Sequence, residues 1–262
     1  MQKFVSIAIV FLLAPAVFAQ EFKIETLIYS GKEKQAVSRN LTLFQDTLVF
    51  DLKLDQATPP NVLETRIYDS RMRAVSLIDT KKKTQVKLTD HRLLQLVDSL
   101  RKDISENEKL SFLIQEKFTE TKQASTDSVE LISPTIRYRA TGKRPADNSR
   151  LSIYNEFLDT FTRLNASHPA GFPPFARLKL NQSIKRMGWL PTKVEVEVQP
   201  NALIPNGLKM SSTHTVIDGL SAQDKERIKT ARSNWLAFKQ VDLLTYRGIQ
   251  KTAAVEETPV KK

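Results

Sequence analysis

The chain has 262 residues, of which 40% are hydrophobic, and a formal net charge of +11. This is the composition of a globular protein, and it excludes a disordered or low-complexity chain. The sequence contains no cysteine. That absence excludes disulfide bonds, thiolate metal sites, a cysteine nucleophile and the acylation site of a bacterial lipoprotein.

The first 19 residues have the order of a secretory signal peptide. Lys3 precedes an apolar run from Phe4 to Leu13, and a cleavage-site pattern ends at Ala19. The run is shorter than the roughly 20 residues of a membrane-spanning helix, and no later stretch reaches that length. We therefore predict cleavage after Ala19, export to the periplasm or secretion, and no transmembrane segment after cleavage.

The N-terminal half alternates apolar and polar residues with the period of strands. This pattern predicts a strand over 22–31 and a hairpin over 38–54 with its turn at Gln45 and Asp46. A second hairpin is predicted over 74–88. Its lysines fall on the turn and on the polar face of one strand, where we expect them to face solvent.

The period then changes between helix and strand along the rest of the chain. Helices are predicted over 91–104, 150–165, 175–188 and 221–234, and strands over 110–120, 129–140, 193–198, 208–219 and 238–248. Short connections favour an antiparallel sheet. We predict a single α+β domain over 20–249, with a largely antiparallel curved sheet and helices packed on one face, and a disordered tail over 250–262.

The order of these elements resembles that of the bacterial lipoprotein-carrier (LolA-like) superfamily. The resemblance rests on the signal peptide and on four segments: "AVSLIDTKKKTQVKL" (74–88), "DHRLLQLVDSL" (90–100), "GWLPTKVEVEV" (188–198) and "HTVIDGL" (214–220). It implies a half-open barrel in which a curved sheet and covering helices enclose an apolar cavity for acyl chains. Along most of its length the chain is also similar to uncharacterised exported bacterial proteins that share "PPFARLKLN" (173–181) and "GWLPTKVEVEV".

The helix predicted over 150–165 carries an apolar stripe at i, i+3, i+4 and i+7, which we expect to lie against the inner face of the sheet. The proline-rich segment after it forms either a rigid start to the next helix or a mobile apolar lid. Proline fixes the backbone and favours the rigid start. The candidates for lining a ligand cavity are Tyr154, Phe157, Leu158, Phe161, Phe172 and Phe175.

No catalytic residue, metal ligand or cofactor site is predicted. The three histidines, His91, His168 and His214, have no metal-binding spacing, and no glycine-rich phosphate loop is present. Ser212, His214 and Asp218 alternate along one strand, whereas a catalytic triad has to converge in space. The paired carboxylates Glu195 and Glu197 fit the solvent face of a strand.

Basic residues form two clusters in the sequence, one of lysines in the 74–88 hairpin and one around "IRYR". The candidates for contacting an anion are Lys81, Lys82, Lys83, Lys87, Arg137 and Arg139. We do not expect nucleic acid as a partner of an exported protein. The function predicted from sequence is therefore an exported, non-catalytic binding protein that holds an apolar or amphiphilic, lipid-like ligand between sheet and helices. The alternative is a basic module that contacts an anionic polymer or protein of the cell envelope.

Overall fold

The computed structural model describes residues 21–107, 110–115, 117–123, 127–168, 172–201 and 204–249. The predicted signal peptide and the predicted disordered tail lie outside these residues. Within the described part of the chain, no helix is both long and apolar enough to cross a membrane.

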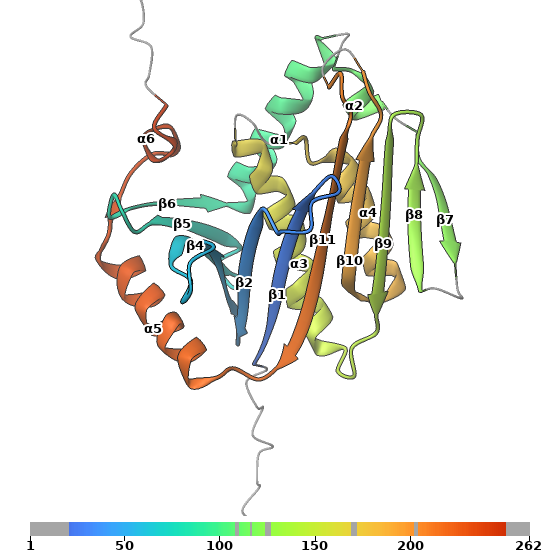
Figure 1. Cartoon of the computed structure of the whole chain (residues 1–262). Helices are drawn as coiled ribbons and strands as arrows, with labels where there is room; N and C mark the ends of the chain where they lie inside the picture. The colour runs from blue at the N-terminus through green and yellow to red at the C-terminus, as the bar shows by residue number, and fades with distance from the viewer. Residues whose placement is uncertain are drawn as a thin grey trace, which may run out of the picture.

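The described strands form one sheet in the order β12-β6-β5-β4-β3-β2-β1-β11-β10-β9-β8-β7. They are β1 (Phe22–Ser30), β2 (Ser38–Gln45), β3 (Leu48–Leu54), β4 (Val62–Asp69), β5 (Ala74–Asp79), β6 (Thr84–Thr89), β7 (Thr119–Gln123), β8 (Ser128–Ile132), β9 (Ile136–Lys143), β10 (Leu190–Val198), β11 (Leu208–Asp218) and β12 (Lys239–Gln240). The pairs are antiparallel except for β12 with β6. The sheet is strongly twisted, so β5 and β6 run across the direction of β9 and β10 (Figure 1). Its edge strands β12 and β7 do not pair with each other, so the sheet is open.

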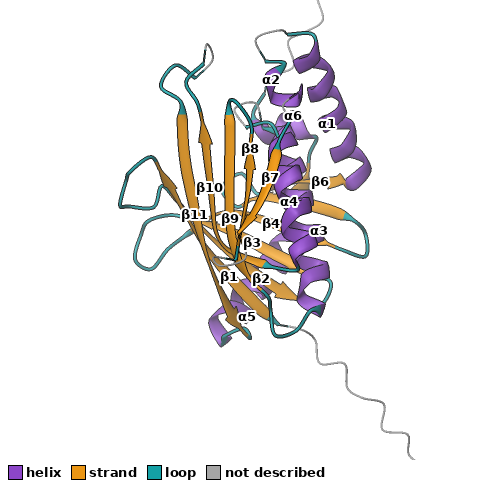
Figure 2. Ribbon diagram, turned by 90° about the vertical axis from the view of Figure 1, so that its right-hand side faces the viewer, coloured by secondary structure: helices purple, strands orange, loops and turns teal. Residues whose placement is uncertain are grey.

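The helices are α1 (Asp90–Ser105), α2 (Phe112–Gln115), α3 (Ser149–Leu164), α4 (Phe175–Met187), α5 (Ala222–Ala237) and α6 (Leu243–Arg247). Figure 2 shows α1, α3 and α4 together on one side of the sheet, which we call its inner face. The predicted α+β class with a curved, largely antiparallel sheet is confirmed. One detail differs, because α5 covers the other, outer face instead of joining the inner layer.

The reason for α5 lies in the strands beneath it. Strands β2 and β3 are apolar on the outer face, where Leu43 and Phe50 pack with Ile228 of α5. At one end they are apolar on the inner face too, where Phe44 and Val49 pack with α3. A strand with two apolar faces needs cover on both, and α5 supplies the second cover.

Local signals start and end the helices as expected. The Thr89 side chain caps α1, and Ser221 with Asp224 forms a complete capping box at the start of α5. Helix α4 ends at Gly188, which adopts the left-handed conformation at φ 66°.

The apolar stripe of α3 packs against the sheet. The Phe157 ring contacts the Phe44 ring edge to face, at a centroid distance of 5.6 Å.

Four segments differ from the sequence predictions. The single strand expected over 129–140 is an antiparallel hairpin of β8 and β9 joined at 133–135, where Pro134 has no amide to donate to the sheet. The expected strand over 110–120 begins instead with the short helix α2, because Leu110, Leu113 and Ile114 fall at helical spacing and pack beside α1. The expected strand over 238–248 contains only the short β12. The Asp242 side chain then accepts hydrogen bonds from the Leu244 and Thr245 amides and starts α6. Strand β4 was not predicted.

Candidate ligand cavity

A cavity of about 580 Å³ lies between the inner face of the sheet and helices α3 and α4. Strands β1 to β4 form one side, β9 to β11 form the floor, and α3 with the start of α4 closes the other side. Sites for small molecules and cofactors typically measure about 300–1,000 Å³. The cavity therefore has the size of a ligand site and lies between the sheet and the helices.

The first part of the lining, here called the apolar wall, comes from α3 and from β1, β10 and β11. Five of the six predicted cavity residues line the cavity: Tyr154, Phe157, Leu158, Phe161 and Phe172. Phe157 is 8% exposed, whereas Leu158 is only partly buried, so the stripe belongs to the core at one end and to the cavity at the other. The strands add Ile24, Ile28, Val194, Val196, Leu208 and Met210.

Phe175, the sixth candidate, lies outside the cavity. Its side chain packs with Val97 and Ile104 of α1, and the guanidinium of Arg101 sits 4.5 Å from its ring centroid. Phe175 and Arg177 are two positions apart on α4, about 200° around the helix, so Phe175 points to α1 while Arg177 points to the cavity. The two prolines before it and Phe172 border the cavity, and Pro174 is the N-cap of α4. The proline-rich segment thus leads directly into α4 and contributes to the cavity lining.

The opposite part of the lining, here called the polar wall, was not predicted. Its side chains occupy inner-face positions of β1 to β4: Thr26, Ser38, Asn40, Thr42, Asp51, Lys53, Glu64 and Arg66. Strand register explains the grouping, because residues paired across neighbouring strands point to the same face. Thr42, Asp51 and Arg66 form one such row, and Asn40, Lys53 and Glu64 form the next.

Asp51 is the centre of the first row, with a side chain only 4% exposed. Its carboxylate accepts hydrogen bonds from Thr42 Oγ1 at 2.7 Å and from Asn40 Nδ2 at 3.1 Å. Arg66 Nη2 lies 2.7 Å from the same carboxylate. The Arg66 guanidinium also lies 5.2 Å from the ring centroid of Phe161, so it joins the polar wall to the apolar wall.

His214 enters the cavity from β11. Its Nδ1 lies 3.0 Å from Thr26 Oγ1 and its Nε2 lies 2.9 Å from Ser212 Oγ. Burial, helped by the positive charge of Arg177, lowers the pKa of His214 to about 4. The imidazole is therefore neutral at pH 7 and presents a polar but uncharged group.

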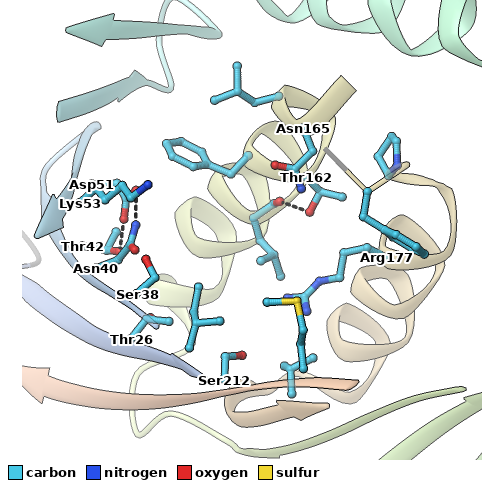
Figure 3. Close-up of a pocket in the computed structure, with 18 of the residues that line it drawn as sticks. Thr26, Ser38, Asn40, Thr42, Asp51, Lys53, Thr162, Asn165, Arg177 and Ser212 are labelled. Carbon is cyan, nitrogen blue, oxygen red and sulfur yellow. Dashed lines mark hydrogen bonds between the residues drawn. The ribbon is translucent and has the colours of Figure 1, made fainter. Parts of the chain in front are cut away.

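The charges of the cavity are unequal. Four cationic side chains line it, Lys53, Arg66, Arg177 and Arg247, against the two carboxylates of Asp51 and Glu64. Figure 3 shows Arg177 reaching from α4 into the cavity, across from the polar residues of β2 and β3. The cavity thus combines an apolar wall with a net positive polar lining.

The catalytic arrangement weighed from the sequence does not form. Asp218 lies toward the far end of β11 and pairs with Arg150, so it is not a partner of His214. Glu195 and Glu197 pair with Lys193 and Lys209 at 2.6 and 2.8 Å. These are surface pairs on the strands. Within the described residues, no group of three or more His, Asp or Glu side chains is placed to hold a metal ion.

The six predicted anion contacts are split between two places. Lys81, Lys82, Lys83 and Lys87 lie on the hairpin of β5 and β6, near one edge of the sheet. There the Lys81 and Lys82 amides donate to Asp79, and the carbonyl of Lys83 accepts from the Lys239 amide. Lys81, Lys82 and Lys83 lie on the turn and Lys87 on strand β6, so the predicted placement on a turn and a strand is confirmed.

Arg137 and Arg139 lie on β9, toward the other edge of the sheet. Both pair with Glu130, at 2.9 and 3.6 Å. The two predicted clusters are therefore separate, and the second is partly neutralised.

Comparisons with known proteins add little. No protein-family model matches the chain, and no curated protein matches it. Among solved structures, that of PNGF-II in the P21 space group aligns over 88% of this chain and 33% of its own, with 11% identity and a TM-score of 0.38. The same protein in the C2 space group gives 10% identity and a TM-score of 0.37. This chain spans about a third of their length, and likeness at this level carries no argument about function.

Proposed function

We propose that the chain is an exported, non-catalytic binding protein that holds an amphiphilic, lipid-like ligand in the cavity. The observation that supports this most is the two-sided lining, with an apolar wall on α3, β10 and β11 and a polar wall on β1 to β4. An apolar chain gains free energy by leaving water for the first wall, at about 25 cal/mol per Å² buried. A polar head needs hydrogen-bonding or charged partners, which the second wall and the Arg177 guanidinium across from it both offer.

The order of elements resembles that of lipoprotein carriers, which enclose acyl chains. This resemblance also supports the proposal of a lipid-like ligand. Export is proposed from the signal-peptide pattern of residues 1–19. Ser212 and His214 are hydrogen-bonded at 2.9 Å, but Asp218 lies apart from them and pairs with Arg150. A complete triad is therefore not assembled, which favours binding over catalysis. A basic envelope-contact module remains the alternative, but its predicted residues lie in two places on the sheet.

Filling the cavity tests the proposal. Ile28 lines the cavity from β1, and Leu27 is its neighbour on the opposite face of the same strand. A fluorescent fatty-acid analogue titrated into the purified parent should bind. We expect Ile28→Trp to weaken binding by at least about tenfold, because an indole occupies the space of the chain and costs more than about 1.4 kcal/mol of binding free energy.

Leu27→Trp is the matched control and should bind as the parent does. Thermal unfolding of both variants confirms that they are folded. Absence of binding by the parent, or equal binding by Ile28→Trp and Leu27→Trp, would reject the cavity as a ligand site.

A further inference from the structure

Arg177 is held in a defined position at the cavity. It lies near the start of α4, and its Nε donates to Asn181 Oδ1 at 3.0 Å. Asn181 is 3% exposed, and its own Nδ2 donates to Asp159 Oδ1 and Thr162 Oγ1, both at 3.0 Å. This chain of hydrogen bonds fixes one edge of the guanidinium. The rest of the group extends toward the middle of the cavity (Figure 3).

The Nη groups of Arg177 make no hydrogen bond or ion pair with the residues that the structure describes. Both carboxylates of the cavity are engaged elsewhere. Asp51 pairs with Arg66, and Glu64 accepts a hydrogen bond from the Tyr246 hydroxyl at 3.5 Å. A guanidinium carries five N–H donors in a planar fork, so Arg177 has donors to spare.

The charge of Arg177 acts inside the cavity. Burial raises the pKa of the Tyr154 phenol, and the charge of Arg177 acts against that rise. The same charge helps burial to keep His214 neutral. The charge of Arg177 therefore acts on two neutral groups of the lining, the Tyr154 phenol and the His214 imidazole. Charge interactions are stronger in such a partly buried setting than in water, which favours an anion at the guanidinium.

We propose that Arg177 binds the anionic head group of the amphiphile while its chain lies along Leu158, Phe161 and Met210 of the apolar wall. This inference rests on the proposed function. The head group is a carboxylate or a phosphate monoester, since both offer paired oxygens that match the guanidinium fork. The ligand class is thus an acidic, chain-bearing lipid, in contrast to a neutral one.

Calorimetric titration of the purified protein separates the alternatives. The probes are dodecanoate, dodecyl phosphate, neutral dodecanol, and acetate and inorganic phosphate without a chain. The variants are Arg177→Gln, Arg177→Lys, which keeps the charge, and Lys185→Gln. Lys185 is an exposed residue of the same helix outside the cavity lining, so its change is a matched loss of charge.

We expect Arg177→Gln to lower the affinity for dodecanoate and for dodecyl phosphate by about tenfold or more. This is the usual effect of losing a hydrogen bond to a charged group. Dodecanol should bind the parent and Arg177→Gln equally. Arg177→Lys should recover part of the preference for charged probes, and Lys185→Gln should change nothing. Urea unfolding of each variant shows whether the loss of the Asn181 contact matters for folding.

Three results would overturn the inference. Equal binding of charged and neutral probes by the parent would remove the head-group role and leave the cavity as an apolar site. Tight binding of acetate or inorganic phosphate alone, lost in Arg177→Gln, would assign a site for a free anion. Absence of binding for every probe with a chain would reject the proposed function itself.

Discussion

Asp51 places a negative charge on the inner face of the sheet, almost fully removed from solvent. Three donors from β2 and β4 compensate the charge: Thr42, Asn40 and Arg66. Removing one partner of a buried pair leaves the other charge uncompensated, which costs far more than the pair contributes. The polar wall is thus a connected unit whose members depend on one another.

Asp51→Ala should lower the free energy of unfolding by about 3 kcal/mol, because it leaves Arg66 without its counter-charge beside an apolar ring. The control is Glu226→Ala. Glu226 pairs with Lys229 on the surface of α5, where both side chains are more than half exposed, and its loss should cost less than about 1 kcal/mol. Urea unfolding measures both, and equal losses would contradict a buried role for Asp51.

His214 should make stability depend on pH. Its pKa is about 4 in the folded chain and about 6.5 when unfolded, so the unfolded state binds more protons between these values. The stability that neutral His214 contributes is present above pH 6.5 and is lost as pH falls toward 4. From pH 7 to pH 5 the expected loss is about 2 kcal/mol.

His214→Gln isolates this contribution, since glutamine does not titrate. The difference in unfolding free energy between parent and His214→Gln should shift by that amount between pH 7 and pH 5, measured by urea unfolding. A difference that stays constant with pH would mean that His214 is already charged, or exposed, in the folded chain.

Helix α3 contributes residues both to the core and to the cavity lining. Phe157 contacts Phe44 and Phe161 in the core, at ring-centroid distances of 5.6 and 4.2 Å. We expect Phe157→Ala to cost about 3–5 kcal/mol of unfolding free energy. Leu158 lines the cavity and is only partly buried, so Leu158→Ala should cost about half as much.

Ligand affinity and stability should respond differently to Phe157→Ala and Leu158→Ala. Leu158→Ala removes part of the apolar wall. It should lower both the affinity for the fluorescent fatty-acid analogue and the free energy of unfolding. Urea unfolding with and without the analogue measures both quantities. A large stability loss for Leu158→Ala with no change in affinity would leave α3 as a plain structural helix.

Helix α5 lies on the outer face of the sheet, away from the cavity. Its Ile228 is 3% exposed and packs with Phe50 and Leu52. Ile228→Ala should cost about 2–5 kcal/mol of unfolding free energy and leave ligand affinity unchanged, because the sheet separates this core from the cavity. Parallel unfolding and binding measurements check the separation, and a loss of affinity in a folded variant would contradict it.

At the scale of the whole molecule, most elements of the fold could be predicted from periodicity. The hairpin of β2 and β3, helix α3 and the capped helix α5 follow from alternation, an apolar stripe and a Ser221–Asp224 box. The short apolar run at 110–115 could not be assigned, because four to six residues do not distinguish a strand from a helix. Strand β4 was not predicted, because Pro59 and Pro60 precede it and Glu64 and Arg66 interrupt its apolar residues.

The apolar wall could be predicted and the polar wall could not. In β2 and β3, alternation places Leu41, Leu43, Phe50 and Leu52 on one face, and a simple interpretation assigns the other face to solvent. Helix α5 covers those leucines from outside, so the polar positions turn toward the cavity instead. Which face is enclosed depends on where a helix from the end of the chain packs, and no local pattern specifies that.

Whether the cavity holds the ligand is best measured by the site at which a photoreactive amphiphile crosslinks to the protein. A fatty acid with a diazirine near the end of its chain is bound to the purified protein, irradiated, and the labelled residues are identified by peptide mass spectrometry. We expect label on Leu158, Phe161 and Met210, and loss of that label when unlabelled dodecanoate is added in excess. Label concentrated on the outer face, at Trp235 or the 86% exposed Leu236 of α5, would rule out the cavity as the ligand site.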